Sequence, residues 1–252
     1  MLFGSVGRRG NYGVDTPIVP AIQAFLALVM LQIGYTKIGR DDDSQGWWLI
    51  ASGGILLGIA LLYLHASRRG KFRVWSRALG DLQLEGTERA LDLNCQRGAV
   101  TTLVAARLST GRVLGVDTWS RRSMLMSNRG GSEDQIARRN GVDEGVADRC
   151  EWKQADVRSL NLDGNRYDLV VSGMGIGVLP TAQQRRQAIE EAVRVTKPGG
   201  RLLIADIRHT ASYAKLLREL GCQVSTRPAG WEAWYGGPWL STTLITATKP
   251  VD

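Results

Sequence analysis

The hydrophobic pattern of the chain changes once, after about seventy residues. Two long apolar segments come first, at about 17–38 and 47–64, and the second contains no charged residue. Eighteen helical residues rise roughly 27 Å, which is close to the ~30 Å hydrocarbon core of a bilayer. Residues 39–46 between the segments are polar and acidic. The pattern predicts a hairpin of two transmembrane helices.

The charges that flank the hairpin predict its orientation. Arg8 and Arg9 precede it, and the residues that follow it are also basic: Arg68, Arg69, Lys71 and Arg73. Because positive residues favour the cytoplasmic side, we expect both ends of the hairpin to lie in the cytoplasm. Gly54 and Gly58 form a GxxxG step, which predicts a close approach of the two helices.

Two other interpretations of these segments stay open. They could be buried helices of a soluble cap, since Gln23 and Gln32 interrupt the first one. The first segment could also be a signal peptide behind Arg8 and Arg9, although a second apolar segment follows closely and no cleavage site is clear. The transmembrane hairpin is the interpretation we favour.

The rest of the chain alternates short apolar strands with amphipathic helices. Strands are expected at 90–93, 112–117, 150–155, 167–172, 201–206, about 222–227 and 241–248. Helices are expected at 72–84, 99–108, 132–140, 181–196 and 211–220. This alternation is typical of βαβ units and predicts an α/β fold with a doubly wound parallel sheet. We therefore expect a membrane anchor over residues 1–76 and an α/β domain over 77–252.

Composition and charge agree with this division. The chain has 252 residues, of which 44% are hydrophobic and 22% charged, and this excludes a disordered chain. Cys95, Cys150 and Cys222 form no CxxC pair, so no metal site is predicted. Residues 1–76 carry eight Lys/Arg and four Asp, and residues 77–252 carry 24 Lys/Arg and 20 Asp/Glu, so each part contributes +4 to the net charge of +8. This distribution indicates a membrane partner, and no nucleic-acid partner is expected.

The expected strand ends carry the candidate chemistry, because ligands of parallel sheets bind at the carboxyl ends of the strands. The turn 94–98 follows the first strand and leads into a helix, whose N-terminal amides can face a ligand. Asp117 ends the second strand, where a carboxylate can accept hydrogen bonds from ribose hydroxyls. Asp156 follows the third strand, and Ser172 ends the fourth. An aspartate after a strand is, taken alone, more often a turn or helix-cap residue, but together these residues predict a nucleoside-like ligand.

Five segments carry a resemblance to a known family. They are ALDLNCQRG (90–98), VLGVD (113–117), AD (155–156), YDLVVS (167–172) and EAVRVTKPGGRLLIAD (191–206). Over about residues 85–249 the chain resembles the class I S-adenosylmethionine-dependent methyltransferases. The resemblance implies S-adenosylmethionine as the cofactor. It also implies a Rossmann-like, doubly wound, seven-stranded sheet that is parallel except for an antiparallel last strand.

The resemblance also implies roles for individual residues. Asp117 would bind the ribose and Asp156 the adenine amino group, while Val157 and Trp119 would pack on the adenine. The other implied cofactor contacts are Asp92, Asn94, Gln96, Gly98 and Ser172, around the methionine part. The tail at 230–250 and Trp119 are similar to a subgroup of bacterial methyltransferases, which implies a bacterial inner membrane.

One motif departs from the family pattern. The family usually has an acid followed by three glycines at alternate positions, and here Asn94 and Gln96 replace the first two glycines, leaving Gly98. Glycine permits a positive φ and a close approach of the backbone to a ligand. Asparagine tolerates that conformation, whereas a glutamine side chain would project near the cofactor or hydrogen-bond to it. A pseudo-methyltransferase that acts as a membrane-tethered scaffold is therefore the alternative function.

Methyl transfer from an activated sulfonium requires mainly alignment and exclusion of water. His209 is the candidate base, and a surface or capping histidine is the alternative. Met174, Trp234 and Tyr235 are candidates for an acceptor pocket. The aromatic residues at 231–239 could wall a pocket or rest on a membrane surface, and they could equally form a packed cap over the sheet edge. These features predict a small or lipophilic acceptor. A nicotinamide-dinucleotide dehydrogenase is disfavoured because GxGxxG is absent.

Overall fold

The computed structural model describes residues 8–39, 43–119 and 132–251. The chain forms two compact units, which we call the sheet unit and the helical unit. The sheet unit comprises Met1–Tyr12, Trp75–Pro228 and Thr243–Asp252, and the helical unit comprises Gly13–Val74 and Ala229–Thr242. The main division therefore lies two residues before the boundary expected from the sequence. Residues up to Tyr12, which were expected in the anchor, group with the sheet unit. Residues 229–242, which were expected in the α/β domain, group with the helical unit.

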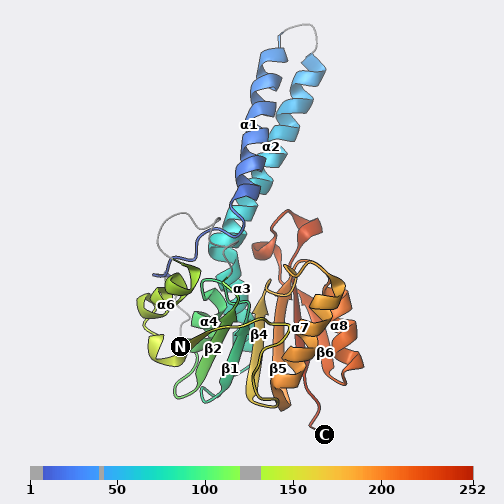
Figure 1. Ribbon diagram of the computed structural model, residues 1–252. Helices are drawn as coiled ribbons and strands as arrows, with labels where there is room; N and C mark the ends of the chain where they lie inside the picture. Colours follow the sequence, from blue (N-terminus) through green and yellow to red (C-terminus); the bar gives the residue numbers. More distant parts are fainter. Residues whose placement is uncertain (1–7, 40–42, 120–131, 252) are drawn as a thin grey trace. The chain divides into compact units, whose positions relative to one another are not determined.

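A seven-stranded sheet forms the centre of the sheet unit (Figure 1). Its strands are β1 (Arg89–Leu93), β2 (Arg112–Asp117), β3 (Cys150–Gln154), β4 (Tyr167–Gly173), β5 (Thr196–Asp206), β6 (Gln223–Pro228) and β7 (Thr243–Thr248). They lie in the order β3-β2-β1-β4-β5-β7-β6. β7 pairs antiparallel with both β5 and β6, and the other pairs are parallel. The predicted Rossmann-like sheet with an antiparallel last strand is confirmed.

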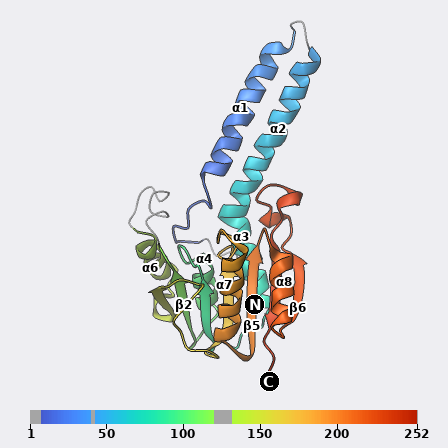
Figure 2. The same ribbon diagram turned by 45° about the vertical axis from the view of Figure 1, so that its right-hand side comes forward.

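The helices that cover the sheet are α4 (Ala99–Ala105), α6 (Glu133–Asp143), α7 (Ala182–Val195) and α8 (Thr210–Glu219). α3 (Lys71–Asp81) leads from the helical unit into the sheet unit. α7 begins with a capping box, in which Thr181 and Gln184 exchange side-chain-to-backbone hydrogen bonds. Figure 2 shows α7 and α8 side by side in front of the strands.

The core lies on both faces of the sheet. The central strands are buried almost throughout, and Leu91, Leu169 and Leu202 have no more than traces of exposed surface. This burial explains why these strands are continuous apolar runs rather than alternating ones. β5 begins five residues before the expected 201, because residues 197–200 form an irregularity in its pairing with β4. Gly199 has a φ of +73° there, so the expected Pro-Gly-Gly turn is a bulge within the strand.

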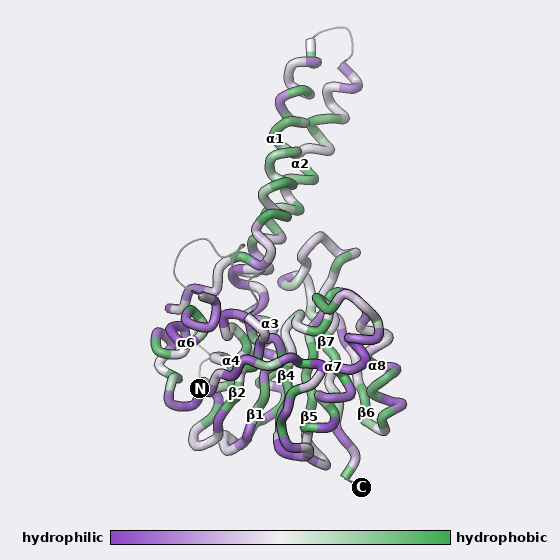
Figure 3. The backbone as a smooth tube through the Cα atoms, viewed as in Figure 1, coloured by the Kyte–Doolittle hydropathy of each residue, from purple (hydrophilic) through white to green (hydrophobic). Residues whose placement is uncertain are grey.

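The helical unit contains α1 (Ile18–Lys37) and α2 (Asp43–His65), followed by a π-helical turn at Ala66–Gly70. Residues 40–42 of the expected acidic loop lie outside the described residues. Figure 3 shows hydrophobic residues along most of both helices. Only 17% of the most apolar 18-residue stretch of α1 is buried. For the continuous helix Asp43–Asp81, which begins with α2, the corresponding share is 22%. Both are therefore long and apolar enough to cross a membrane, and neither is buried like the core helix of a soluble protein.

Glycines set the close contact between α1 and α2. A Cβ on Gly34 would lie 2.8 Å from the Gly46 carbonyl oxygen, and one on Gly53 would lie 3.0 Å from the Ala27 carbonyl oxygen. A Cβ on Gly54 or Gly58 would meet nothing within 4 Å. The prediction that the GxxxG step mediates this contact was therefore wrong. The helical phase places Gly53, instead of its neighbour, on the side that faces α1.

Candidate functional site

The turn 94–98 joins β1 to α4 in a left-handed backbone conformation at alternate residues. The φ angles are +52° at Asn94, +52° at Gln96 and +74° at Gly98. The backbone thus adopts at all three positions the conformation that glycine accepts without strain. For a residue with a side chain this conformation costs about 1–2 kcal/mol, and less for asparagine. The backbone of the turn is therefore left-handed also at the two positions where Asn94 and Gln96 stand in place of glycine.

Asp117 closes a ring of hydrogen bonds with this turn. Its Oδ2 accepts the Gln96 N–H at 2.9 Å, and its Oδ1 accepts the Trp119 N–H at 2.9 Å. The Trp119 indole Nε1–H donates to the Gln96 carbonyl oxygen at 3.0 Å. A carboxylate has about four acceptor positions, so each oxygen of Asp117 can still accept a hydroxyl of a ligand. Three of the expected cofactor residues thus lie together at the carboxyl ends of β1 and β2.

Gln96→Gly is expected to leave the affinity for S-adenosylmethionine within about threefold of the wild type. The described contacts of Gln96 use only its backbone, and its side chain is exposed. Titration calorimetry on the full-length chain measures this affinity. Gln83→Gly is the matched control, because Gln83 also has a positive φ, of +48°, away from the turn. A tenfold gain would show that the side chain obstructs the cofactor, and a tenfold loss would show that it binds it.

The loop after β4 packs directly on the turn. The Asn94 side-chain amide donates to the Gly175 carbonyl oxygen, and the Ser172 hydroxyl donates to the Leu93 carbonyl oxygen at 3.2 Å. A Cβ on Gly175 would lie 2.6 Å from the Cβ of Asn94. Met174, with a φ of +59°, donates its N–H to the Ala205 carbonyl oxygen at 2.7 Å. Ser172 is fully buried and joins β4 to β1, so its contact with the cofactor stays a prediction.

Asp92 lies under the turn, almost completely buried. Its Oδ2 accepts the Thr101 hydroxyl at 2.6 Å. Burial raises the pKa of Asp92 to about 7, although the hydrogen bond from Thr101 opposes this shift. Asp92 therefore supports the turn from below by bonding to α4, and direct contact with the cofactor stays a prediction.

Asp92→Asn is expected to change the dependence of stability on pH. Because burial raises the pKa of Asp92 from 3.8 to about 7, the folded chain holds a proton that the unfolded chain has released over that range. The free energy of unfolding of the wild type therefore falls as the pH rises from about 4 to about 7, on the order of 1–4 kcal/mol. The variant lacks this loss, so its stability relative to the wild type should increase across the window in denaturant unfolding. A constant difference between the two proteins would contradict the raised pKa.

Asp156 and Val157 follow β3. Asp156 Oδ1 accepts the backbone N–H and the Nε–H of Arg158, each at 2.9 Å. The hydrogen bonds from Arg158 hold the pKa of Asp156 below its usual value. Val157 is 1% exposed and belongs to the core of the sheet unit. Adenine recognition by these two residues stays a prediction. The Asp156 carboxylate that would contact the adenine is also hydrogen-bonded to the guanidinium of Arg158.

His209 caps α8 with a φ of +62°, and its side chain is exposed. It lines a cavity of about 370 Å³ between α7 and α8, together with Ala182, Arg185, Arg186, Ser212, Tyr213, Lys215, Leu216 and Glu219. The Tyr213 ring centroid lies 6.5 Å from that of His209, and the Tyr213 hydroxyl is buried without a hydrogen-bond partner among the described residues. Burial raises the pKa of the neighbouring Asp206, and hydrogen bonds from the backbone N–H groups of Ile207, Arg208 and Gly177, followed by the charge of His209, oppose this shift. His209 is therefore both a helix cap and a residue of a cavity, which keeps both interpretations from the sequence open.

The candidate acceptor residues belong to different units. Met174 lies in the sheet unit, whereas Trp234 and Tyr235 lie in the helical unit. Tyr235 is buried and donates its hydroxyl to Asp15 Oδ2 at 3.0 Å. A common acceptor pocket of these three residues stays a prediction.

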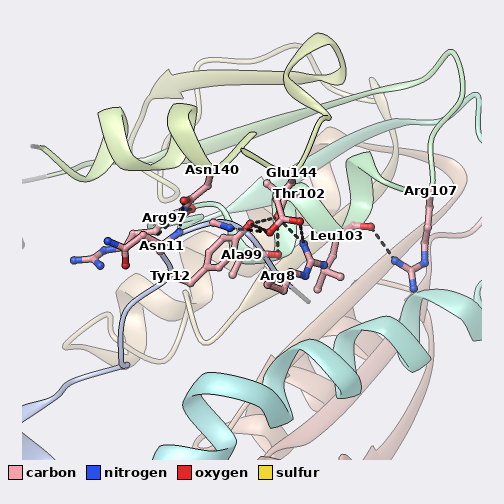
Figure 4. Close-up of polar contacts among 11 residues, drawn as sticks. Arg8, Asn11, Tyr12, Arg97, Ala99, Thr102, Leu103, Arg107, Asn140 and Glu144 are labelled. Carbon is pink, nitrogen blue, oxygen red and sulfur yellow. Dashed lines mark hydrogen bonds and ion pairs between the residues drawn. The ribbon is translucent and has the colours of Figure 1, made fainter. Parts of the chain in front are cut away.

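Asn140, which no sequence pattern singled out, links the turn to the N-terminal residues (Figure 4). Asn140 is 1% exposed, and its Nδ2 donates to the Arg97 carbonyl oxygen at 2.8 Å and to the Asn11 carbonyl oxygen at 3.2 Å. Its Oδ1 accepts the Asn11 N–H at 2.7 Å. Tyr12 completes this attachment by bonding to Thr102 and Glu144. Only contacts distant in sequence identify Asn140, since it is one of several polar residues on α6.

Trp152 was also missed. A Cβ on Gly98 would lie 2.3 Å from its Cη2 atom, and a Cβ on Gly115 would lie 2.9 Å from its ring. Trp152 thus fills the space beneath the turn and explains why glycine is retained at position 98. The signal in the sequence was a tryptophan in an otherwise polar strand.

Comparison with known proteins matches part of this chain to methyltransferases. Residues 91–204 match the methyltransferase domain family. The chain is 31% identical over 136 residues to a demethylmenaquinone methyltransferase of Lactiplantibacillus plantarum, covering 53% of this chain and 52% of that protein. It is 30% identical over 141 residues to a ubiquinone/menaquinone biosynthesis C-methyltransferase of Ectopseudomonas mendocina, covering 54% and 49%. The chain thus spans about half the length of the curated relatives it matches.

A solved structure shows the same fold. The crystal structure of an S-adenosylmethionine-dependent methyltransferase from Methanosarcina mazei superposes with a TM-score of 0.54 at 18% identity, covering 69% of this chain and 98% of the other. The matched family segment includes the turn 94–98, Asp117 and the loop after β4. This chain therefore carries a class I S-adenosylmethionine-dependent methyltransferase domain, and S-adenosylmethionine is its cofactor.

Proposed function

We propose that this chain is a membrane-anchored methyltransferase that transfers the methyl group of S-adenosylmethionine to a small, lipophilic acceptor of the quinone type. The observation that carries the proposal is the hydrogen-bonded ring of Gln96, Asp117 and Trp119 on a turn whose backbone retains its left-handed residues. The acceptor class follows from the names of the relatives, which act on demethylmenaquinone or in ubiquinone and menaquinone biosynthesis.

The proposed anchor consists of α1 and α2. Both helices are apolar and largely exposed, which favours contact with lipid over contact with water. The basic residues on both sides of the hairpin favour a cytoplasmic N-terminus and a cytoplasmic methyltransferase domain, at a bacterial inner membrane. An anchor of this kind keeps the enzyme close to acceptors that are dissolved in the bilayer.

The sheet unit supplies the proposed binding and proton-transfer groups. Asp117 would accept hydrogen bonds from the ribose hydroxyls. Asp156 would accept a hydrogen bond from the adenine amino group while the Asp156 carboxylate stays paired with Arg158. The cofactor supplies an activated methyl group, so the chain has to align the acceptor and exclude water. Methylation of a carbon or oxygen acceptor also releases a proton, and His209 would accept it.

The test begins with titration calorimetry of the detergent-solubilised full-length chain. We expect binding of S-adenosylmethionine and S-adenosylhomocysteine in the micromolar range, and no binding of NADH. Transfer of a radiolabelled methyl group to demethylated quinols, compared with a soluble phenol, then tests the acceptor class. Labelling of the phenol alone would overturn the lipophilic acceptor.

A second candidate is a pseudo-methyltransferase that acts as a membrane-tethered scaffold. Gln96 favours it, since this side chain stands where the family has a glycine. This hypothesis expects a folded chain with no turnover on any acceptor, and a gain in cofactor affinity in Gln96→Gly. Turnover by the wild type would exclude it.

A further inference from the structure

We propose that residues 229–242 and the end of α2 form one docking surface for an anionic bilayer. We call residues 229–242, which connect β6 to β7, the aromatic loop, and residues 66–73 the basic turn. Both belong to the helical unit, and Figure 1 shows the loop in orange-red beside the lower end of α2. The inference rests on the proposed membrane anchor and adds a specific lipid contact to it.

The aromatic loop is packed on the end of α2. The Tyr235 ring meets the Tyr63 ring edge-on, with centroids 5.2 Å apart, and the Tyr235 hydroxyl bonds to Asp15. Trp231 stacks on His65 at 5.3 Å with an interplanar angle of 15°. The loop is therefore attached to the residues at which the apolar stretch of α2 ends. That point corresponds to the membrane interface if α2 spans the bilayer.

Two of the basic residues of the basic turn form ion pairs with acidic residues of the helical unit. Lys71 Nζ lies 2.8 Å from Asp15 Oδ1, and an Arg73 guanidinium nitrogen lies 3.1 Å from Glu232 Oε1. These pairs neutralise two of the four basic residues of the turn. Arg68 and Arg69 are exposed, and no ion pair joins them to the described residues. Two positive charges at a helix end attract the phosphates of anionic lipids.

The outer side of the aromatic loop is apolar. Trp239 is 73% exposed, Trp231 54% and Leu240 37%. Tryptophan is favoured at membrane interfaces, where its ring is partly in lipid and its N–H meets water or headgroups. Exposed tryptophans, together with two arginines that form no ion pair with the described residues, fit a lipid surface with anionic headgroups better than a neutral one. Since the loop joins β6 to β7, lipid contact here would attach the methyltransferase domain to the bilayer through a chain connection other than α3.

The experiment measures the membrane depth of position 239. A nitroxide is attached to Trp239→Cys in the full-length chain, with Cys150→Ser to remove the partly exposed native thiol. The chain is reconstituted in nanodiscs of phosphatidylcholine, alone or with phosphatidylglycerol. Electron paramagnetic resonance then compares accessibility to oxygen with accessibility to a neutral, water-soluble nickel complex. Val178→Cys is the matched control, because Val178 is 67% exposed and lies on the sheet unit.

We expect the nickel complex to reach position 239 several-fold less than position 178 when phosphatidylglycerol is present. Arg68→Gln with Arg69→Gln should remove most of the difference between the two lipid compositions. Equal access to both positions in anionic nanodiscs would overturn the inference, as would an unchanged lipid preference in the arginine variant. Carbonate extraction separates the two proposals. A chain that is extracted from membranes refutes the anchor, whereas a retained chain with an accessible position 239 refutes only the docking surface.

Discussion

Asp117→Ala is expected to weaken binding of S-adenosylmethionine about 5- to 150-fold, which corresponds to about 1–3 kcal/mol. Two losses add up. The proposed ribose contact loses its carboxylate acceptor, and the N–H groups of Gln96 and Trp119 lose the oxygens that hold them at 2.9 Å. The turn is then free to leave its left-handed conformation, which is strained at Gln96.

Calorimetry on the full-length chain measures this loss. Asp163→Ala is the matched control, because Asp163 is an exposed aspartate that pairs with Arg166 and belongs to the same unit. It should bind the cofactor like the wild type. Asp117→Asn should lose less affinity than Asp117→Ala, since an amide oxygen can still accept one of the two N–H groups. Wild-type affinity in Asp117→Ala would remove Asp117 from the site.

Gly98→Ala is expected to lower the free energy of unfolding by about 2–4 kcal/mol and to abolish cofactor binding at micromolar concentrations. The added methyl would lie 2.3 Å from Trp152 Cη2, which is far inside van der Waals contact. In addition, alanine would have to adopt a φ of +74°. Chemical denaturation followed by fluorescence measures the stability, and calorimetry measures the binding.

Gly145→Ala separates the two causes. Gly145 has nearly the same φ, +70°, but a Cβ there would meet nothing within 4 Å. It should therefore show only the backbone strain, of about 1–2 kcal/mol. Trp152→Leu should recover part of the loss when it is combined with Gly98→Ala, because it removes the clashing ring. Equal destabilisation by Gly98→Ala and Gly145→Ala would show that Trp152 moves aside freely.

The architecture of the sheet unit could be predicted from the sequence because its determinants are local. Strands such as β4 are continuous apolar runs, and such runs are stable only when both faces are buried under helices. Asp117 could be predicted as a ligand residue because a carboxylate at the end of a parallel strand lies at the edge where ligands bind. The two apolar helices are likewise evident from length and composition.

The conformation of the site depended on contacts that no local pattern contains. A glutamine has no preference for a φ of +52°, and Gln96 is held there by bonds to Asp117 and Trp119, which lie more than twenty residues away. Asn140 is one of several polar residues on α6 until the Asn11 and Arg97 carbonyl groups are seen to meet it. Side chains of this kind acquire their roles from partners that only the folded chain brings together.

The sequence by itself thus determined the α/β fold, the family of the domain and the two apolar helices, and it predicted the position of the cofactor edge. These depend on periodicity, apolar length and strand ends, which are properties of short segments. The tertiary structure alone decided that residues 229–242 group with the N-terminal helices, that Gly53 rather than Gly54 meets α1, and that the turn is left-handed at two positions without glycine. Each of these depends on long-range packing and hydrogen bonds, whose energies outweigh the local preferences of the residues involved.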